Sequence, residues 1–304
     1  MVEKIGVIFF LVIGLLVISS CDQSSQEGLG VSPKVLDFEF LEDYPQEDLS
    51  EDEEFQVGLK VFNELPVKAE FDLCIKGDRS AYYGGVPVAE DCISEYVDEA
   101  YEGSGGTIIP SEKIVYFPSE MATYSYHDLD DSVGDVSIRA EMTFSINSLS
   151  SVDVCILDNP NLQEDIDCDA DEILGNSRIQ QKAFPLVVSK IEKDIKRIAG
   201  SSKIDLKIYL DKASTGGIIR EEDSQFDLID VHVFLSGTPA EFVCKKREGR
   251  VVFMEGDPIE CTADLEFDES PIIYKDNLNI NLGYKYKSVK SKKIVFNIDW
   301  WEDQ

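Results

Sequence analysis

The residues best suited to chemistry are four aspartates at alternate positions of one acidic stretch. They are Asp165, Asp167, Asp169 and Asp171, within the segment DIDCDADE. Carboxylate oxygens at this spacing are the ligands that Ca²⁺ takes in the first half of an EF-hand loop. The stretch departs from that loop, because Ala170 stands where the loop requires glycine and Asn176 where it requires a bidentate glutamate. Two interpretations follow, a weak calcium site and a solvated acidic linker, and the linker is the commoner origin of such a run.

Catalytic groups other than carboxylates are scarce. The chain has two histidines, His127 beside Asp128 in a polar stretch and His232 inside an alternating apolar segment. No G-x-S-x-G, G-x-x-x-x-G-K or H-E-x-x-H motif occurs, so the usual signals of serine hydrolases, phosphate-binding loops and metalloproteases are missing. Two carboxylates suffice for glycoside hydrolysis, but pairs are expected by chance among 60 acidic residues. The sequence therefore predicts a protein without catalytic activity, with no catalytic residue and no cofactor apart from the calcium considered above.

The seven cysteines divide into one near the N-terminus, Cys21, and six in the body of the chain. The six fall into neighbouring couples, none with the C-x-x-C spacing of a zinc site. Six cysteines allow 15 pairings. Proximity favours the bridges Cys74–Cys92, Cys155–Cys168 and Cys244–Cys261. Such disulfides indicate an oxidising, extracellular compartment, where they are expected to pin polar loops on a β scaffold.

Residues 1–21 have the three parts of an export signal. A short head with Lys4 precedes the apolar run 5–18, which is followed by small residues. The run is shorter than the ~20 residues that a transmembrane helix normally needs. The segment ISSC, which ends at Cys21, resembles a lipoprotein processing box, although Ser20 replaces the commoner glycine or alanine. The resemblance implies that Cys21 is lipidated and becomes the mature N-terminus, and the alternative is an uncleaved signal anchor.

The charge balance bears on the partners of the chain. Sixty acidic residues against 28 basic ones give a net charge of −32. This balance disfavours nucleic acid as a partner, because binding to phosphates depends on Lys and Arg. An acidic chain is also repelled by an anionic membrane surface, so the expected membrane contact is the N-terminus. We therefore expect a membrane-anchored protein of the cell surface with a soluble extracellular part.

Period-2 alternation bounded by Gly, Pro, Asn and Asp predicts an all-β fold. The main alternating segments are 35–41, 55–62, 71–75, 114–117, 136–144 and 152–156 before the acidic stretch, and 186–188, 204–210, 226–235, 251–254, 261–267, 278–286 and 293–298 after it. The last two are predicted to form a closing hairpin. The segment 189–199 is interpreted as a strand that ends in a bend.

The two sets of strands match in order, so the sequence predicts two tandem immunoglobulin-like β-sandwich domains. The expected division is 1–21 as signal peptide or anchor, 22–32 as linker, 33–162 as the first sandwich, 163–180 as an acidic linker and 181–304 as the second sandwich. Sandwich domains have about 100 residues each, so the exported part has room for two with insertions.

The segment FQVGLKVFN at 55–63 and the expected closing hairpins resemble immunoglobulin-like domains of the CARDB type, which occur on bacterial and archaeal cell surfaces. The likeness covers most of residues 33–300 in outline. It implies adhesion, scaffolding or ligand presentation, with an unknown extracellular protein or glycan as partner and no chemistry. The alternative is a structural subunit of a surface layer or filament, self-associating through edge strands or through Trp300 and Trp301. No residue of a binding site is predicted.

Overall fold

The computed structural model describes residues 36–296, apart from 80, 105, 120–121, 130–133, 158–167, 183, 199–200, 214–216, 219–226, 248 and 266–272. Strands make up most of this part, and its helical content is two single 3-10 turns, η1 (Ala81–Tyr83) and η2 (Asn176–Arg178). The predicted all-β class is therefore confirmed. None of these residues belongs to a helix that is long and apolar enough to cross a membrane.

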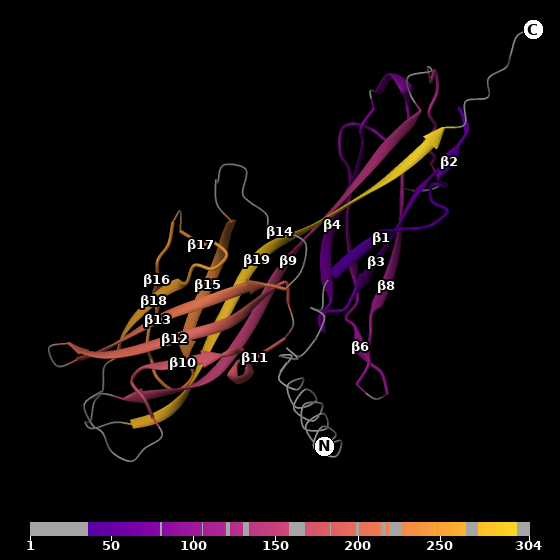
Figure 1. Cartoon of the computed structure of the whole chain (residues 1–304). Coiled ribbons are helices and arrows are strands. Elements are labelled where there is room, and N and C mark those ends of the chain that lie inside the picture. Colours follow the sequence, from indigo (N-terminus) through magenta and orange to yellow (C-terminus); the bar gives the residue numbers. More distant parts are fainter. Residues whose placement is uncertain are drawn as a thin grey trace, which may run out of the picture. The chain divides into compact units, whose positions relative to one another are not determined.

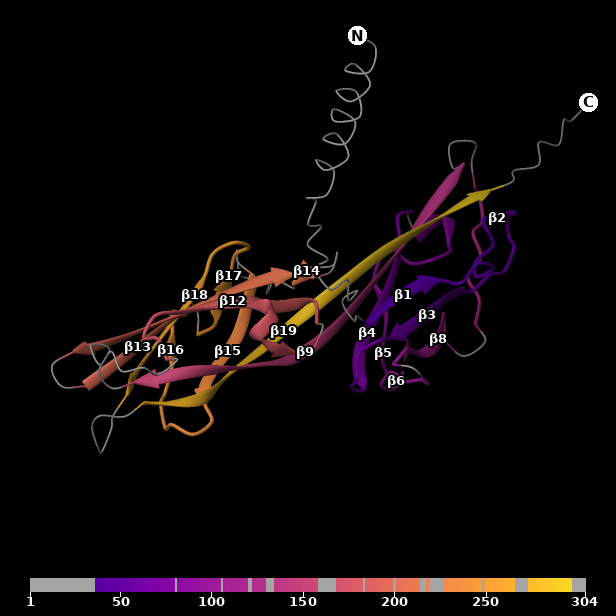
Figure 2. The same ribbon diagram turned by 60° about the horizontal axis from the view of Figure 1, so that its bottom comes forward.

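Two long antiparallel strands, β9 (Asp135–Leu157) and β19 (Ile273–Phe296), run side by side through the structure (Figures 1 and 2). Their pairing is unbroken from Asp135 opposite Val295 to Leu157 opposite Ile273. Two predictions are wrong here. The segments 136–144 and 152–156 are parts of one strand, and 278–286 does not form a hairpin with 293–298, because the described residues of both lie on β19. The polar residues between the apolar runs keep the alternation instead of forming a turn, since Ser148 and Ser150 are buried and the residues on either side of them are more exposed.

Beside the first half of β9, strands β4 (Ala69–Gly77) and β5 (Asp91–Val97) extend this sheet to one edge. A separate sheet contains β1 (Leu36–Phe40), β3 (Val57–Asn63) and β8 (Ser111–Phe117). Alternate residues of both sheets are fully buried in one core, including Phe38, Leu59, Leu73 and Ile138. The short strand β2 (Asp48–Leu49) pairs with the end of β19, and β6 (Tyr101–Glu102) pairs with β7 (Ile108–Ile109). We call these elements the N-terminal half.

The remaining strands form the C-terminal half. A five-stranded sheet has the order β10 (Glu172–Gly175), β12 (Leu186–Ile198), β13 (Ser201–Lys212), β18 (Ile259–Leu265) and β16 (Val243–Cys244). The sheet of β9 and β19 is extended by β15 (Asp227–Leu235), β17 (Val251–Phe253), β11 (Gln180–Gln181) and β14 (Gly217–Ile218). The strand predicted at 189–199 is thus part of β12, while its predicted bend lies outside the described residues.

The strand pairing crosses the expected boundary between the sandwiches at 33–162 and 181–304. The final segment of β19 pairs with the first residues of β9, which β4 flanks on the other side. Residues 33–304 also group as one unit. The division into two tandem domains stays a prediction, but the two halves share β9 and β19. From Cys168 onward, the expected acidic linker contains β10 and η2.

Candidate functional site

A buried lysine lies against the end of the predicted calcium segment. Lys193, on β12, is 2% exposed. Its Nζ donates to the backbone oxygens of Cys155 at 2.7 Å and Asp169 at 2.8 Å, and it lies 3.2 Å from Oε2 of Glu172. Burial lowers the pKa of Lys193, and the Glu172 carboxylate opposes that shift. The ammonium therefore provides positive charge inside this acidic turn, with two carbonyls and one carboxylate around it.

The predicted calcium ligands are only partly described. Asp165 and Asp167 lie outside the described residues, whereas Asp169 and Asp171 lie next to Lys193. The carboxyl group of Asp171 donates a hydrogen bond to that of Asp194, and this bond raises the pKa of Asp171. The buried ammonium of Lys193 thus already balances part of the negative charge around Asp169 and Asp171. Calcium binding by the four aspartates stays a prediction.

Calcium binding is checked by thermal unfolding and calorimetry on the full chain. If the four aspartates form the site, millimolar Ca²⁺ is expected to raise the melting temperature, because an ion that binds only the folded state stabilises it. Mg²⁺ is expected to have no such effect, since it demands a tighter octahedral shell. An unchanged melting temperature and no heat of binding would refute the site.

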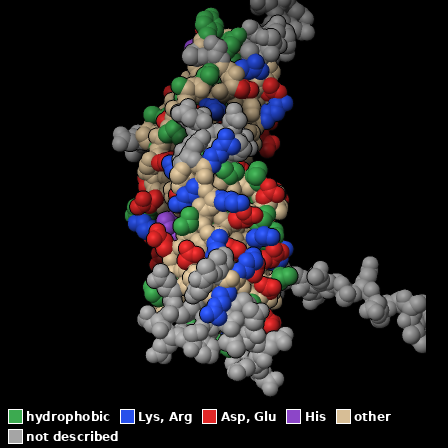
Figure 3. Space-filling model, turned by 90° about the vertical axis from the view of Figure 1, so that its left-hand side faces the viewer, with side chains coloured by type: hydrophobic (Ala, Val, Ile, Leu, Met, Phe, Trp, Pro, Cys, Tyr) green, Lys and Arg blue, Asp and Glu red, His purple; other side chains and the backbone are tan. Residues whose placement is uncertain are grey.

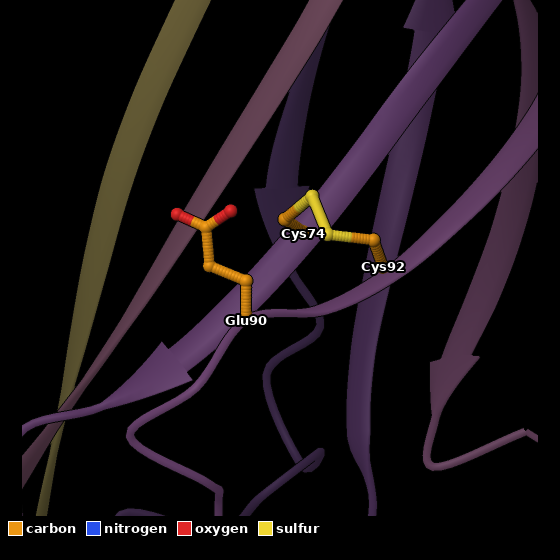
Figure 4. Close-up of side chains that lie close together, drawn as sticks. All are labelled: Cys74, Glu90 and Cys92. Atoms are coloured by element: carbon orange, nitrogen blue, oxygen red, sulfur yellow. A yellow bond between two sulfur atoms is a disulfide. The ribbon is translucent and has the colours of Figure 1, made fainter.

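A second group of metal-ligating types occurs at Cys74, Glu90 and Cys92, and it is the one such cluster in the described part of the chain (Figure 4). The two sulfurs form a disulfide there, and Glu90 points at the same face of β4. Only a thiolate binds a metal ion well, so the bridge leaves a single carboxylate as ligand. This cluster is therefore a structural crosslink.

All three predicted cysteine couples lie at disulfide distance, with Cα–Cα separations of 4.1 Å for Cys74–Cys92, 5.4 Å for Cys155–Cys168 and 3.9 Å for Cys244–Cys261. The first and the third join residues directly opposite each other on paired strands. These two bridges therefore crosslink adjacent strands, in addition to closing the polar loops that the sequence indicated.

The two histidines are exposed and lie on different elements. His232 is on the outer face of β15, between the buried Val231 and Val233. The ring of His127 lies against Gly84, where a Cβ atom would come within 2.6 Å of its Cε1. Gly84 also has a φ of +70°, which favours glycine. The position of His127 is thus explained by packing on a tight turn.

One concave surface lies where the two halves meet, and we call it the junction groove. Its volume is about 670 Å³. It is lined by Leu65, Val67, Lys68, Ala69, Glu70, Phe71, Asp72, Ser94, Glu95, Tyr96, Thr143, Phe144, Ser145, Ile146, Asn147, Phe184 and Lys285. Phe71, Phe144, Ile146 and Phe184 are buried and form an apolar floor. The groove is therefore apolar at its base and polar along its walls.

The groove exists because one edge of β9 is unpaired over a short stretch. Pairing with β4 ends at Phe144, and pairing with β11 begins at Ser150. Between these points, no other described strand pairs with β9 on this side. The chain before β4 turns away because Asn63 holds the loop, with its Nδ2 donating to the carbonyl oxygens of Val67 and Asp98, each at 2.8 Å. The sheet is thus interrupted at the junction.

The register shows which backbone groups of β9 point to this open edge. The Cα separation of 4.1 Å at Cys74–Cys92 is that of a non-hydrogen-bonded pair, so the N–H and C=O of Cys74 point to β9. Glu141 lies opposite Cys74, so the N–H and C=O of Glu141 point to β4 in turn. Alternation then directs the N–H and C=O of Asn147 to the open edge. Cys155 is an even number of residues after Asn147, so its N–H points to the same side of β9. There it donates to Oε2 of Glu172 at 3.2 Å.

The walls of the groove combine an aromatic ring with charged and hydroxyl groups. Tyr96, on the edge strand β5, is 47% exposed, and the Lys68 ammonium lies 3.4 Å from the centre of its ring. Ser94 donates to Asp72 at 2.5 Å. Lys113 lowers the pKa of Glu95 through a hydrogen bond of 2.6 Å. Cations and carboxylates therefore alternate around the opening, without a dominant sign.

Charges elsewhere are also intermixed. The outer face of β12 and β13 carries a ladder in which Glu192 pairs with Lys190 at 2.8 Å, and Asp205 pairs with Lys196 at 3.2 Å and Lys203 at 3.5 Å. Figure 3 shows this mixing of Lys and Arg with Asp and Glu side chains over one face of the molecule. Exposed pairs of this kind contribute little stability, and they keep a strongly acidic chain locally balanced.

Sequence reasoning missed the junction groove and Lys193. The alternating segments 136–144 and 152–156 give no sign that the residues between them continue one strand, and no binding residue is predicted anywhere in the chain. Lys193 was placed on a strand, but one lysine among 28 basic residues gives no signal that it is buried. The alternation of Ile191 and Ile195 on the same face was the available sign, because it places Lys193 between them in the core.

Comparison with known proteins adds no relative. No protein-family model matches this chain, and a search of the curated proteins found no match.

Proposed function

We propose that this chain is a membrane-anchored binding module of the cell surface, without catalytic activity, and that the junction groove is its binding site. The observation that carries the proposal is the groove, an open cavity with an apolar floor, polar walls and unpaired backbone of β9 at its edge. Small-molecule and glycan sites have this combination of apolar surface and a few directed polar groups. The disulfides and the export signal support a location outside the cell.

The binding role is tested with the full chain in detergent micelles on an array of extracellular glycans and proteins. Tyr96→Ala is expected to lower binding about tenfold, because tyrosine is enriched among the residues that dominate binding and a loss of about 1.4 kcal/mol is a factor of ten. Tyr101→Ala is the matched control, since Tyr101 is also exposed in the N-terminal half but does not line the groove. Equal loss in both variants, or ligand binding that neither variant changes, would contradict the proposal. Turnover of a bound glycan would contradict the absence of catalysis.

The anchoring role is tested at Cys21. Cys21→Ala is expected to abolish incorporation of a labelled fatty acid and to release the protein into the soluble fraction, because a lipid-modified N-terminal cysteine would be the membrane attachment. Cys21→Ser is the conservative control and is expected to behave in the same way. Retention of either variant in the membrane would instead indicate an uncleaved signal anchor.

A structural subunit that assembles through strand edges is the second candidate. Edge strands β5 and β10 support it, since β10 carries the exposed Ile173. The stretch of β19 from Lys287 to Lys293 argues against assembly there, because lysines on a strand edge oppose pairing between chains. Light scattering distinguishes the candidates. A mass that stays constant on dilution supports the binding module, and concentration-dependent polymers support the subunit.

A further inference from the structure

We propose that the free edge of β15 is a second binding site, which takes an extended, uncharged peptide as an additional strand. The site is a concave surface of about 830 Å³ lined by residues 231–234 of β15, residues 239–244 and Lys246, and we call it the β15 groove. It shares no lining residue with the junction groove, so the inference goes beyond the proposed function.

The edge is free because β17 covers only the first residues of β15. Strand β17 pairs with β15 from Asp227 to Ile229. On its other side, β15 pairs with β19 from Asp230 to Leu235. Among the described strands, none pairs with the side opposite β19 beyond Ile229. Residues 231–235 therefore keep one unpaired side, which spans roughly 17 Å at the rise of a strand.

The register directs three alternate residues of β15 to this free side. The N–H of Ser236 donates to the carbonyl oxygen of Asn277 at 3.0 Å, so the backbone of Ser236 points to β19. Because backbone groups alternate along a strand, those of Val231, Val233 and Leu235 point away from β19. A single amide would pair with one of these residues and leave the other two unpaired. An extended peptide of about five residues pairs with all three, as in the addition of a strand to a sheet edge.

The lining of the β15 groove is mainly apolar. Phe234, on the outer face of β15, is 45% exposed, and Val243, on β16, is 66% exposed. Phe242 and Ala240 also line the groove and pack against the core. Alternate side chains of an added strand would cover these apolar surfaces, which are otherwise in contact with water.

The charges of the lining favour an uncharged peptide. Its titratable side chains are His232, Glu241 and Lys246, so one carboxylate is balanced by one ammonium. A peptide with several charges of one sign meets no complementary field there. Valine and threonine suit the site, because β-branched residues are enriched in strands and carry no charge.

The second wall of the groove favours a single peptide over another copy of the chain. Residues 239–244 form this wall, so an incoming strand has to lie between them and β15. A peptide has no further strand attached to its far side. A second copy that pairs through the same edge brings its own residues 239–244 to the interface, because the same surface is used by both copies of a symmetric dimer.

The test measures binding of a fluorescent, end-capped Val-Thr-Val-Thr-Val peptide to the full chain in detergent micelles by fluorescence anisotropy, with empty micelles as the blank. Two forms of the peptide are methylated on alternate backbone nitrogens, one on the valines and the other on the threonines. In an added strand, only one of these sets of N–H groups points to β15. The unmodified peptide is therefore expected to bind, one methylated form is expected to bind at least about tenfold more weakly, and the other is expected to keep its affinity.

A protein variant locates the site. Phe234→Ala is expected to lower the affinity for the unmodified peptide about tenfold, because it removes an aromatic contact of the groove. Tyr101→Ala is the control, since Tyr101 is exposed but does not line the β15 groove. Melting temperatures verify that both variants fold.

Failure of the unmodified peptide to bind, equal affinity of the two methylated forms, or full affinity in folded Phe234→Ala would overturn the inference. A dimer in light scattering that Phe234→Ala dissociates would overturn it too, because a second copy would then occupy the edge. The binding role of the junction groove is tested separately through Tyr96, so it does not depend on these results.

Discussion

Lys193→Ala is expected to lower the free energy of unfolding by about 3 to 5 kcal/mol, the usual cost of removing one partner of a buried ion pair. The substitution removes the closer of the two cations beside the Glu172 carboxylate, since Arg178 lies 3.7 Å away, and it takes the Lys193 donor from the carbonyl oxygens of Cys155 and Asp169. Each unsatisfied buried group is costly because it has lost its hydration. Urea unfolding followed by circular dichroism measures the change.

Two further variants distinguish the contribution of burial to stability from that of charge. Lys196→Ala, on the same strand, removes a lysine whose ion pairs lie at the surface, and it is expected to cost less than about 1 kcal/mol. Combining Lys193→Met with Glu172→Leu removes both charges, and the double variant is expected to regain part of the lost free energy of unfolding. If Lys193→Ala costs no more than Lys196→Ala, the ammonium does not stabilise the acidic turn.

Leu282→Ala is expected to destabilise both halves together, by about 2 to 5 kcal/mol. Leu282 is fully buried on β19, in the C-terminal half, opposite Ser148 of β9. Because β9 and β19 continue into the N-terminal half, the loss is expected in one cooperative transition. Native-state hydrogen exchange is the direct measurement, and amides of β4 are expected to lose as much protection as those of β15.

Phe234→Ala is the control for this prediction. Phe234 lies on β15 near Leu282 in the sheet, but its side chain is exposed. Its truncation is expected to change protection in β4 by less than about 1 kcal/mol, since it opens no cavity in the core. Two separate unfolding transitions in Leu282→Ala, with β4 unaffected, would show that the halves are independent domains despite their shared strands.

The fold class could be predicted because burial follows alternation. Leu73 and Ile75 on β4, and Ile204, Leu206 and Ile208 on β13, are buried at every second position, as the sequence pattern indicates. The cysteine couples could be proposed from proximity alone. These features depend on local sequence, and local sequence was sufficient for them.

The length of β9 and β19 could not be predicted in the same way. Ser145, Asn147 and Ser148 are typical of turns, and only a partner strand with the same unbroken register keeps them extended. The groove depends on where β4 and β11 stop, which is set by loops such as the one that Asn63 holds. Burial of Lys193 depends likewise on carbonyl oxygens from two distant segments. Each of these features results from tertiary contacts that leave no local pattern.

The shared strands also set an order of events during biosynthesis. Residues that pair between β9 and β19 are separated by more than a hundred positions along the chain. Contacts of such high sequence separation form slowly, because a large loop must close first. Because synthesis proceeds from the N-terminus, β1 to β9 emerge well before β19, which completes their sheet. The edge of β9 then stays open to wrong pairing until the last strand has been made, so chaperones are expected to act on this protein at that stage.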